Sequence, residues 1–329
     1  MRVTIIQNPA SGDQALQASD LIAAVRRAGH QPAYAATTDP AAVAARLADP
    51  GDLVAIVGGD GTMRNVVTRL IGRGVPLTLL PAGTANNVGR SLGITGETLA
   101  LIDAWSSATL VPFDTGIVRG ARTPAPLIEG MGFGPIAVTI AALSSLTAAE
   151  AHAAWTAAEV RRDLKVLREV LADYPVHACQ IAIDGEDRSG DYILVEVMNV
   201  RSVGPNVTLA PQASVSDGLF DLVLLTDADR VALREYLTAR LDGTAATFDP
   251  PVHRGRHVEL TWHGSRVHVD DEVWPDERDA SNGTAWSRDG LVRLEVLMNP
   301  AALQILVPHV DGGPLRLRAS GPTATSPAT

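Results

Sequence analysis

The amino-acid sequence predicts a two-domain α/β plus β protein, with an N-terminal parallel-sheet α/β domain and a C-terminal antiparallel β-sandwich-like domain. Up to about residue 112, short apolar runs alternate with segments of helical periodicity, a pattern typical of βαβ units. From Phe113 onward, strand-like runs separated by turn signals dominate. The chain has 329 residues, 46% of them hydrophobic, which is enough for two buried cores.

The first domain is expected to be built on a parallel sheet. Apolar runs at Val3–Ile6, Leu53–Val57 and Val75–Leu80 predict strands that are buried on both faces. Apolar residues recur at helical spacing after the first two runs, over 21–25 and 63–70. Because crossovers between parallel strands are right-handed, we expect the loops that follow these strands at one edge of the sheet.

The second domain is expected to be rich in antiparallel strands, with one long helix over Thr147–Ala172. The predicted strands are Val176–Ile183, Tyr192–Asn199, Leu219–Leu225, His257–Trp262, Val267–Val269 and Val292–Met298.

These patterns divide the chain into a first domain over 1–115 and a second domain over 116–298. Residues 299–310 are expected to return to the first domain, with an amphipathic helix over Pro300–Leu306. The segment 311–329 is rich in Pro, Ser, Thr and Gly, which predicts a disordered tail.

Composition excludes several classes of protein. The net charge is −10, which argues against nucleic-acid binding. The single cysteine, Cys179, cannot form an internal disulfide, and its strand-like surroundings predict a buried thiol. We expect a cytoplasmic protein, because a strand pattern follows Met1 without a signal peptide and the long apolar stretches are interrupted by charges.

Three loops of small residues follow predicted strands. They are NPASG at Asn8–Gly12, GGDGT at Gly58–Thr62 and PAGTANN at Pro81–Asn87. A glycine cluster between a strand and a helix allows backbone N–H groups to approach a phosphate. The alternative for GGDGT is a tight hairpin turn, but helical rather than strand periodicity follows it. Three such loops at one sheet edge favour a nucleotide cleft.

Asp60, within GGDGT, is unusual for a phosphate loop because a carboxylate repels phosphate. Its presence is explained if a divalent cation or a hydroxyl substrate lies beside it, whereas a turn residue needs no such explanation. Walker A, GxGxxG, HExxH and CxxC motifs are absent from the sequence, and its histidines lack the spacing of metal ligands.

Five segments together resemble the diacylglycerol kinase catalytic-domain family, which includes sphingosine, ceramide and bacterial lipid kinases. The segments are NPASG, VGGDGTMRNVV, LPAGTANNVGRSLGI, FDTG and PQASVSDGLFDL. The resemblance extends from Val3 to about Pro308. It implies an NAD kinase/diacylglycerol kinase-like nucleotide domain, a β-rich lipid-acceptor domain and a cleft between them.

The resemblance also implies the binding sites for ATP and for a structural Mg²⁺. The implied ATP-binding residues are Asn8, Pro9, Ala10, Ser11, Gly12, Thr37 (or, as the alternative, Thr38), Gly58, Gly59, Asp60, Gly61, Thr62, Met63, Arg64, Asn65, Gly83, Thr84 and Asn86. The family usually has Glu at the position of Asn65. The implied Mg²⁺ ligands are the carbonyls of Ser214 and Leu219 and the carboxylate of Asp217, where the alternative is a simple turn.

The resemblance places the proton acceptor in a late DGE-like motif. Asp184–Glu186 matches the letters but falls in a hairpin before the SDGLFD block. The DDE at Asp270–Glu272 follows that block, so we assign the role to Glu272, with Asp271 in place of the usual glycine. Asp60 and Asp114 are implied as an acidic network; the alternative for Asp114 is a turn at a strand end. Residues 275–290 are predicted to form a loop.

The function implied by the resemblance is an ATP-dependent lipid kinase that transfers the γ-phosphoryl group to a hydroxyl of a diacylglycerol or sphingoid-type lipid, with Mg²⁺. The alternatives are an NAD kinase-like enzyme and a nucleotide- or lipid-binding pseudokinase. We expect transient peripheral contact with a lipid at the inner membrane face, acyl chains against apolar surface of the second domain, and no nucleic-acid partner. The sequence leaves a homodimer open.

Overall fold

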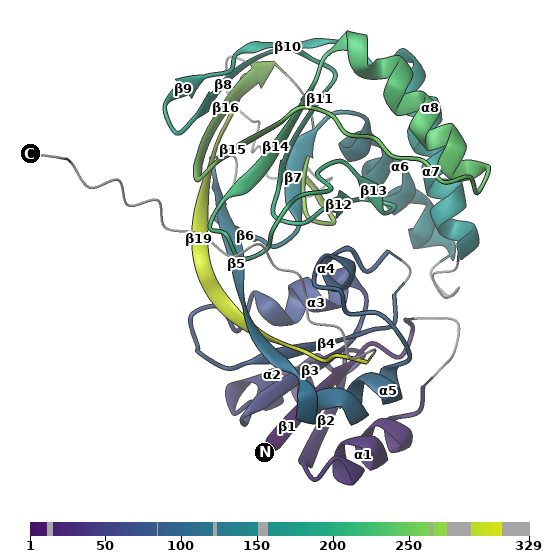
Figure 1. The fold of residues 1–329 in the computed structure, drawn as a ribbon, viewed down its shortest axis with the longest axis vertical. Helices are drawn as coiled ribbons and strands as arrows, with labels where there is room; N and C mark the ends of the chain where they lie inside the picture. The colour runs from purple at the N-terminus through teal and green to yellow at the C-terminus, as the bar shows by residue number, and fades with distance from the viewer. Residues whose placement is uncertain are drawn as a thin grey trace, which may run out of the picture.

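The protein has two lobes that are joined by long strands (Figure 1). The computed structural model describes residues 1–11, 16–83, 85–120, 124–150, 157–263, 266–274 and 291–310. The predicted loop over 275–290 and the predicted tail over 311–329 lie outside the described residues. Within the described part of the chain, no helix is long and apolar enough to cross a membrane.

The N-terminal lobe is the predicted parallel α/β domain. Its strands pair in the order β4-β3-β1-β2, all parallel. They are β1 Arg2–Gln7, β2 Gln31–Ala36, β3 Leu53–Gly58 and β4 Leu77–Pro81. Its helices are α1 Ala18–Arg27, α2 Pro40–Ala48, α3 Asp60–Val67, α4 Asn87–Ser91, α5 Thr98–Asp103 and the 3₁₀ helix η1 Ala104–Ser107. The central strands β1 and β3 are buried along their length except for Arg2, as their continuous apolar runs predict.

Local sequence explains where these helices begin and end. Asp39 accepts a hydrogen bond from the Ala42 amide at 2.9 Å, and Pro40 follows it as the first residue of α2. Gly29 has φ +81° just after α1, a conformation that costs little only for glycine.

The C-terminal lobe is a β-sandwich with helices on one side, which confirms the predicted fold class. One sheet has the order β15-β14-β11-β7-β17-β18; the other continues from the N-terminal sheet through β19 to β16, β8 and β10, with β5 and β6 on a side branch and β9 on β8. A short third sheet pairs β12 with β13. The strands are β5 Thr109–Arg119, β6 Ala125–Leu127, β7 Gly130–Phe133, β8 His177–Ile183, β9 Glu186–Asp187, β10 Gly190–Tyr192, β11 Leu194–Met198, β12 Ser202–Val203, β13 Val207–Thr208, β14 Phe220–Leu225, β15 Val252–Gly255, β16 His257–His263, β17 Val267–Val269, β18 Glu272–Trp274 and β19 Leu291–Val307.

Apolar side chains of the two sheets meet between them, for example Leu222 and Val195 from one sheet and Leu260 and Ile181 from the other. Cys179 is buried in the same core, as predicted, and burial raises the pKa of its thiol to about 12. The outer face of the sheet that contains β14 and β11 packs against helices, which lie together on one side of this lobe (Figure 1). The helices of the lobe are α6 Pro135–Glu150, α7 Ala157–Asp173, η2 Asp227–Asp229 and α8 Arg230–Leu241.

The predicted helix over Thr147–Ala172 is confirmed in its larger part by α7, whereas residues 147–150 belong to the end of α6 and residues 151–156 lie outside the described residues. The rest of α6 and all of α8 were not predicted. The residues of α6 are almost uniformly small or apolar, so they show no stripe at helical spacing. The buried residues of α8 follow helical spacing, so this helix has a signal in the sequence: Leu233, Tyr236, Leu237 and Leu241.

The predicted helix over Pro300–Leu306 is instead the end of strand β19. Here β19 pairs antiparallel with β5, from Leu303↔Phe113 to Val307↔Thr109, and Ile305 also pairs parallel with Leu77 of β4. Leu303, Ile305 and Val307 are buried and alternate with more exposed residues, which is strand periodicity. Hydrogen bonding to strands on both sides decides the conformation of this segment.

Asp114 joins the two lobes at the irregular point of β19. It lies within β5 and not at a strand end, and it is only 1% exposed. Its carboxylate accepts hydrogen bonds from the backbone amides of Ala301 and Gly218, both at 2.7 Å. Ala301 has φ +49° and sits between Asn299 and Leu303, where the pairing register shifts. The carboxylate therefore stabilises a strained backbone segment. Without it, the two amides would lose their hydrogen-bond acceptor.

We expect Asp114→Ala to lower the free energy of unfolding by about 2–4 kcal/mol, because two buried amides lose their acceptor. Urea unfolding followed by circular dichroism measures this change. Asp114→Asn keeps one acceptor oxygen and should lose less. An unchanged free energy of unfolding in Asp114→Ala would show that these two hydrogen bonds do not hold the lobes.

Candidate active site

The predicted loops meet at the carboxyl edge of the parallel sheet. The Asn8 amide donates to the Val57 carbonyl at 2.9 Å, and the Asn8 side chain donates to Thr62 Oγ1 at 3.3 Å. A Cβ atom on Gly83 would stand 2.5 Å from the Cα of Gly59. The second and third loops therefore pack backbone against backbone, which only glycine permits here.

A cavity of about 690 Å³ opens from these loops into the space between the lobes. The N-terminal lobe contributes most of the predicted nucleotide residues to its walls. These are Asn8, Ser11, Thr37, Gly59, Asp60, Gly61, Thr62, Asn65, Gly83 and Asn86. The C-terminal lobe contributes Glu129, Asp270 and Asp271 together with an apolar wall from α6 and α7. The cavity thus brings a set of backbone-rich loops close to carboxylates and to apolar side chains.

Some predicted nucleotide residues have other surroundings. Met63 is 2% exposed and belongs to the hydrophobic core, so its side chain does not face the cavity. Pro9, Ala10 and Gly58 lie in the predicted loops but are not among the residues that line the cavity. Gly12 and Thr84 lie outside the described residues.

Asp60 links two of the loops. It is the first residue of α3, and its carboxylate accepts hydrogen bonds from the amides of Asn87 at 2.9 Å and Val88 at 3.3 Å. These amides begin α4, where free N–H groups favour a carboxylate. Burial, the largest effect, raises the pKa of Asp60, and the nearby charge of Asp271 acts in the same direction.

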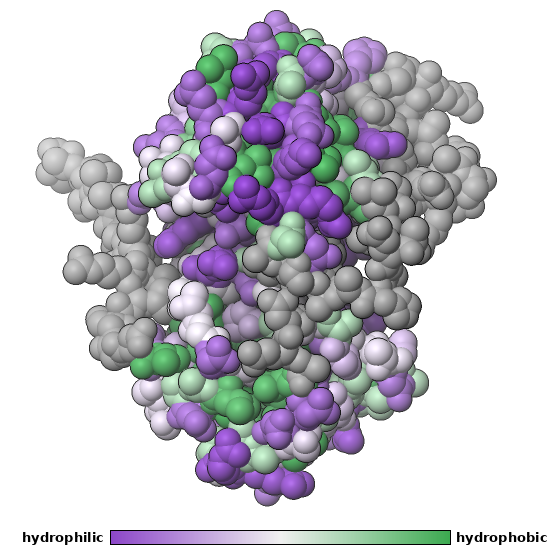
Figure 2. Space-filling view, turned by 90° about the vertical axis from the view of Figure 1, so that its right-hand side faces the viewer, coloured by the Kyte–Doolittle hydropathy of each residue, from purple (hydrophilic) through white to green (hydrophobic). Residues whose placement is uncertain are grey.

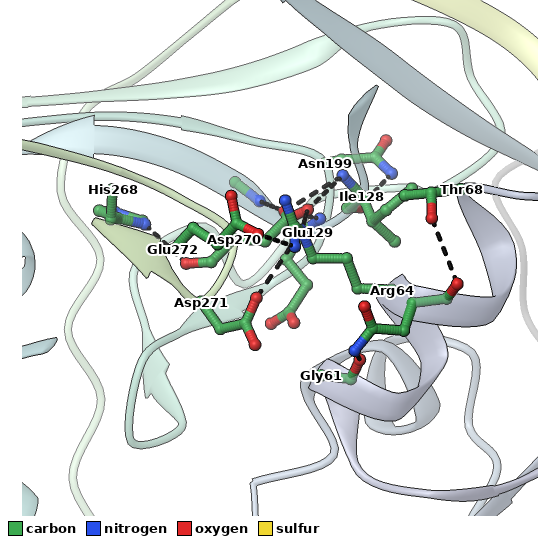
Figure 3. Close-up of polar contacts among 12 residues, drawn as sticks. Gly61, Arg64, Thr68, Ile128, Glu129, Asn199, His268, Asp270, Asp271 and Glu272 are labelled. Carbon is green, nitrogen blue, oxygen red and sulfur yellow. Dashed lines mark hydrogen bonds and ion pairs between the residues drawn. The ribbon is translucent and has the colours of Figure 1, made fainter. Parts of the chain in front are cut away.

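A turn of the C-terminal lobe faces α3 with three consecutive carboxylates. Strands β17 and β18 form a hairpin in which Val269 pairs with Glu272, so Asp270 and Asp271 form the turn. Arg64 reaches from α3 to all three carboxylates (Figure 3). Its Nη1 is 2.7 Å from Glu272, and its Nε is 3.2 Å from Asp270 and 3.7 Å from Asp271. Arg64, predicted to contact nucleotide, therefore forms an ion-pair cluster between the lobes.

Asp270 is the buried member of the turn. Its carboxylate accepts hydrogen bonds from the amides of Ile128 at 3.1 Å, Glu129 at 2.8 Å and Gly130 at 3.3 Å. Burial, the largest effect, raises its pKa to about 6, although the Glu129 amide and Arg64 act in the opposite direction. Asp270 also adopts φ +54°, so the left-handed residue of this turn is Asp270 and not Asp271. An aspartate at position 271 is thus compatible with the backbone.

Glu129 is a site residue that the sequence did not reveal. It is 8% exposed, lines the cavity and accepts a hydrogen bond from Asn87 Nδ2 at 3.0 Å. Burial and then the charges of Asp60 and Asp270 raise its pKa well above the usual value for a glutamate. A single Glu between two short strands carries no motif, so only the fold identifies it. Asp270 could have been found, because it belongs to the VDDE run.

Two of the predicted catalytic residues, Glu272 and Asp114, do not line the cavity. Glu272 is about half exposed, at 49%, and is held by Arg64 rather than lining the cavity. Asp114 lies elsewhere, in the hydrogen bonds between β5 and β19 described above. The rejected DGE, Asp184–Glu186, is a hairpin turn whose Asp184 accepts hydrogen bonds from the amides of Arg256 and His257.

The predicted Mg²⁺ ligands lie near Asp114 and outside the cavity wall. Asp217 Oδ1 accepts a hydrogen bond from the Leu219 amide at 3.1 Å, and the Ser214 hydroxyl is buried without a hydrogen-bond partner. The negative charge of Asp217 contributes to the raised pKa of Asp114, after burial as the main cause. A carboxylate, loop carbonyls and an unsatisfied hydroxyl are donors that suit a hard cation such as Mg²⁺.

Two family models match successive parts of the chain. Residues 2–118 match the family model "Diacylglycerol kinase catalytic domain". Residues 138–307 match "YegS C-terminal NAD kinase beta sandwich-like domain". A protein of Pseudomonas aeruginosa named "Probable lipid kinase YegS-like" is 30% identical, covering 94% of this chain and 95% of its own. The chain belongs to the bacterial diacylglycerol kinase and YegS-like lipid kinase family.

Further relatives agree with this assignment. A "Diacylglycerol kinase" of Bacillus subtilis is 30% identical over 74% of this chain and 79% of its own, and one of Mycobacterium tuberculosis is 28% identical over 81% and 80%. A crystal structure of a diacylglycerol kinase from Bacillus anthracis covers 94% of this chain and 97% of its own, with a TM-score of 0.65 and 15% identity, which shows a shared fold. The NAD kinase-like alternative is not favoured by these relatives.

The raised pKa of Asp270 predicts how stability depends on pH. A carboxyl whose pKa is about 6 in the folded state and 3.8 in the unfolded state stabilises the fold below about pH 4 and loses this contribution as the pH rises through 6. The contribution amounts to about 3 kcal/mol at most. We expect Asp270→Asn to flatten the decline in unfolding free energy between pH 4 and pH 7. Urea unfolding across this range measures it, and identical slopes in both proteins would contradict the prediction.

Proposed function

We propose that this protein is an ATP-dependent lipid kinase that transfers the γ-phosphoryl group of ATP to a hydroxyl of a diacylglycerol or sphingoid-type lipid. One observation carries the proposal. A single cavity is lined by the glycine-rich loops of one lobe and by carboxylates and apolar helices of the other. A nucleotide and an apolar acceptor can therefore meet at the carboxylates. The names of the relatives support the choice of a lipid as acceptor.

The nucleotide side is formed by the loops after β1, β3 and β4. Their backbone N–H groups and the start of α3 suit phosphate groups. The carboxylates of Asp60 and Asp271 border this region and provide oxygen ligands for the Mg²⁺ that accompanies ATP. When bound, Mg²⁺ supplies charge neutralisation of the phosphates.

The turn between β17 and β18 supplies the proton acceptor for the lipid hydroxyl. The sequence motif favours Glu272, which Arg64 orients at 2.7 Å. Asp271 competes for the role because it lines the cavity and approaches the second loop; a Cβ atom on Gly61 would stand 2.8 Å from its Oδ2. Both carboxylates belong to the same short hairpin, so the two candidates are neighbours in one turn.

The apolar part of the cavity suits the acyl chains. Ile140 and Leu143 of α6 and Val160 of α7 line it. Large hydrophobic residues that are exposed, among the described residues, lie at separate places such as Leu110, Val176 and Val231. In the face shown in Figure 2, hydrophobic residues are scattered among hydrophilic ones on the upper lobe. A wall inside the cavity therefore offers a better site for a lipid chain than this outer surface. We place the lipid at a membrane surface with which the protein makes transient peripheral contact.

The assay for this function follows transfer of labelled phosphate from ATP to diacylglycerol in mixed micelles, with NAD and acceptor-free samples as controls. We expect lipid phosphorylation only with a lipid acceptor, and a panel of lipid extracts then identifies the preferred lipid. Nucleotide binding without transfer to any acceptor would support the pseudokinase instead.

Removing the proposed carboxylates should abolish transfer. We expect Glu272→Gln to lower kcat by about 10²–10⁴-fold, as for loss of a general base, with the KM for ATP nearly unchanged. Asp60→Asn should also lose transfer while the protein stays folded. Wild-type kcat in Glu272→Gln combined with loss in Asp271→Asn would assign the proton acceptor to Asp271. Wild-type kcat in both variants would exclude this turn.

The apolar wall should affect lipids according to chain length. We expect Leu143→Ser to raise the KM for a long-chain diacylglycerol about tenfold, because burial of one leucine side chain against the acyl chain is lost. A short-chain diacylglycerol, which does not reach this wall, should be affected much less. Leu110→Ser, on an exposed part of β5, is the matched control. Equal effects on both chain lengths would contradict the proposed site.

A further inference from the structure

A glutamate and a histidine form a fully buried pair directly behind the turn that carries the acidic residues. Glu196 lies on β11 and His268 on β17, and both are 0% exposed. His268 Nε2 lies 3.0 and 2.9 Å from the two carboxylate oxygens of Glu196. His268 Nδ1 lies 3.0 Å from the backbone carbonyl oxygen of Asp270. The pair thus connects the middle of the sheet to the turn.

A glycine between them makes the contact possible. Glu196 and His268 both pair with Gly132 of β7, so the three residues lie in one row across three strands. A Cβ atom on Gly132 would stand 2.6 Å from the carboxylate of Glu196. Any side chain at this position would occupy the space in which the pair meets.

The hydrogen-bond partner of the His268 ring shows which ring nitrogen must carry a proton. The Asp270 carbonyl only accepts hydrogen bonds, so Nδ1 of His268 carries a proton and donates it. The other ring nitrogen, Nε2, lies within hydrogen-bond distance of both carboxylate oxygens of Glu196. Burial by itself lowers the pKa of His268, but the charge and hydrogen bond of Glu196 outweigh it, so the pKa is raised. The ring is therefore held in one orientation with Nδ1 toward the turn.

The turn needs this support because its backbone is strained. Asp270 adopts φ +54°, which is uncommon for a residue other than glycine. Its amide donates to the Gly130 carbonyl at 2.8 Å, and its carboxylate accepts the amides of 128–130. The hydrogen bond from His268 fixes the remaining polar group of the residue, its carbonyl. With Asp270 fixed on all sides, the next two carboxylates project toward α3 (Figure 3).

We propose that Glu196 and His268 are positioning residues, which hold the Asp270 turn so that the carboxylates of Asp271 and Glu272 face α3. The catalytic half of this inference rests on the proposed kinase function. Stability alone does not account for the pair, because replacing a buried ion pair by apolar residues of similar volume is often neutral or stabilising. A geometric requirement at the turn does account for it.

The test removes both members at once, so that no charge is left buried alone. In Glu196→Met/His268→Leu we expect a folded protein with near wild-type ATP affinity. Hydrogen–deuterium exchange of the peptide over 267–274 should rise about tenfold, and kcat should fall about 10²-fold, as for loss of alignment. Glu196→Met/His268→Asn restores a donor near the Nδ1 position, so exchange over 267–274 and kcat should both return most of the way to wild-type values. This variant also tests the inference if the first variant does not fold.

A second histidine–glutamate pair provides the control. His257 Nε2 lies 3.0 Å from Glu295 Oε1, on strands β16 and β19 of the other sheet. His257→Leu/Glu295→Met should change neither kcat nor exchange over 267–274.

The outcomes separate the inference from the proposed function. Unchanged exchange over 267–274 in the first variant would overturn the positioning role, whether or not the protein phosphorylates lipid. Faster exchange with wild-type kcat would overturn its catalytic half. A wild-type protein without lipid turnover would refute the proposed function, while the exchange measurement would still decide whether the pair holds the turn.

Discussion

Strand β19 is the constraint on which the rest of the structure depends. This strand runs through both lobes (Figure 1). It pairs with β16 in the C-terminal lobe, with β4 in the N-terminal lobe, and with β5 along most of its length. The strands of the two domains therefore form a single sheet. Breaking individual backbone hydrogen bonds along this strand would leave buried N–H and C=O groups unpaired. Strand β19 therefore joins the two lobes on either side of the cavity into one hydrogen-bonded sheet.

Within that cavity the arrangement of charge is unusual. The carboxylates of Asp60, Glu129 and Asp270 are drawn from distant parts of the chain, and each has a raised pKa because it is buried. Of these three carboxylates, Asp270 forms an ion pair with the guanidinium group of Arg64. Such a group of acids is costly without a ligand, since burial removes water and like charges repel. A cation or a hydroxyl donor placed among them would relieve this cost, which fits phosphoryl transfer to an alcohol.

The sequence and the structure disagree where local signals were weak or ambiguous. Segment 300–306 was predicted as a helix, yet pairing with strands on either side makes it part of β19. The nearly uniform apolar composition of α6 hides its helical period. Glu129 and Glu196 have no motif around them, and the partner of His268 comes from another strand, so no local pattern reveals these residues as a site.

The sequence by itself determined the two-domain fold class and the three glycine-rich loops, since continuous apolar runs and small residues after strands act locally. The VDDE run and the resemblance to the diacylglycerol kinase family were also readable from the sequence. Only the tertiary structure decided that Arg64 contacts this run, that Asp114 accepts hydrogen bonds from the amides of Gly218 and Ala301, and that Asp270 takes the left-handed conformation. Each of these depends on residues far apart in the chain, whose contacts arise from the packing of the sheets and not from any local pattern.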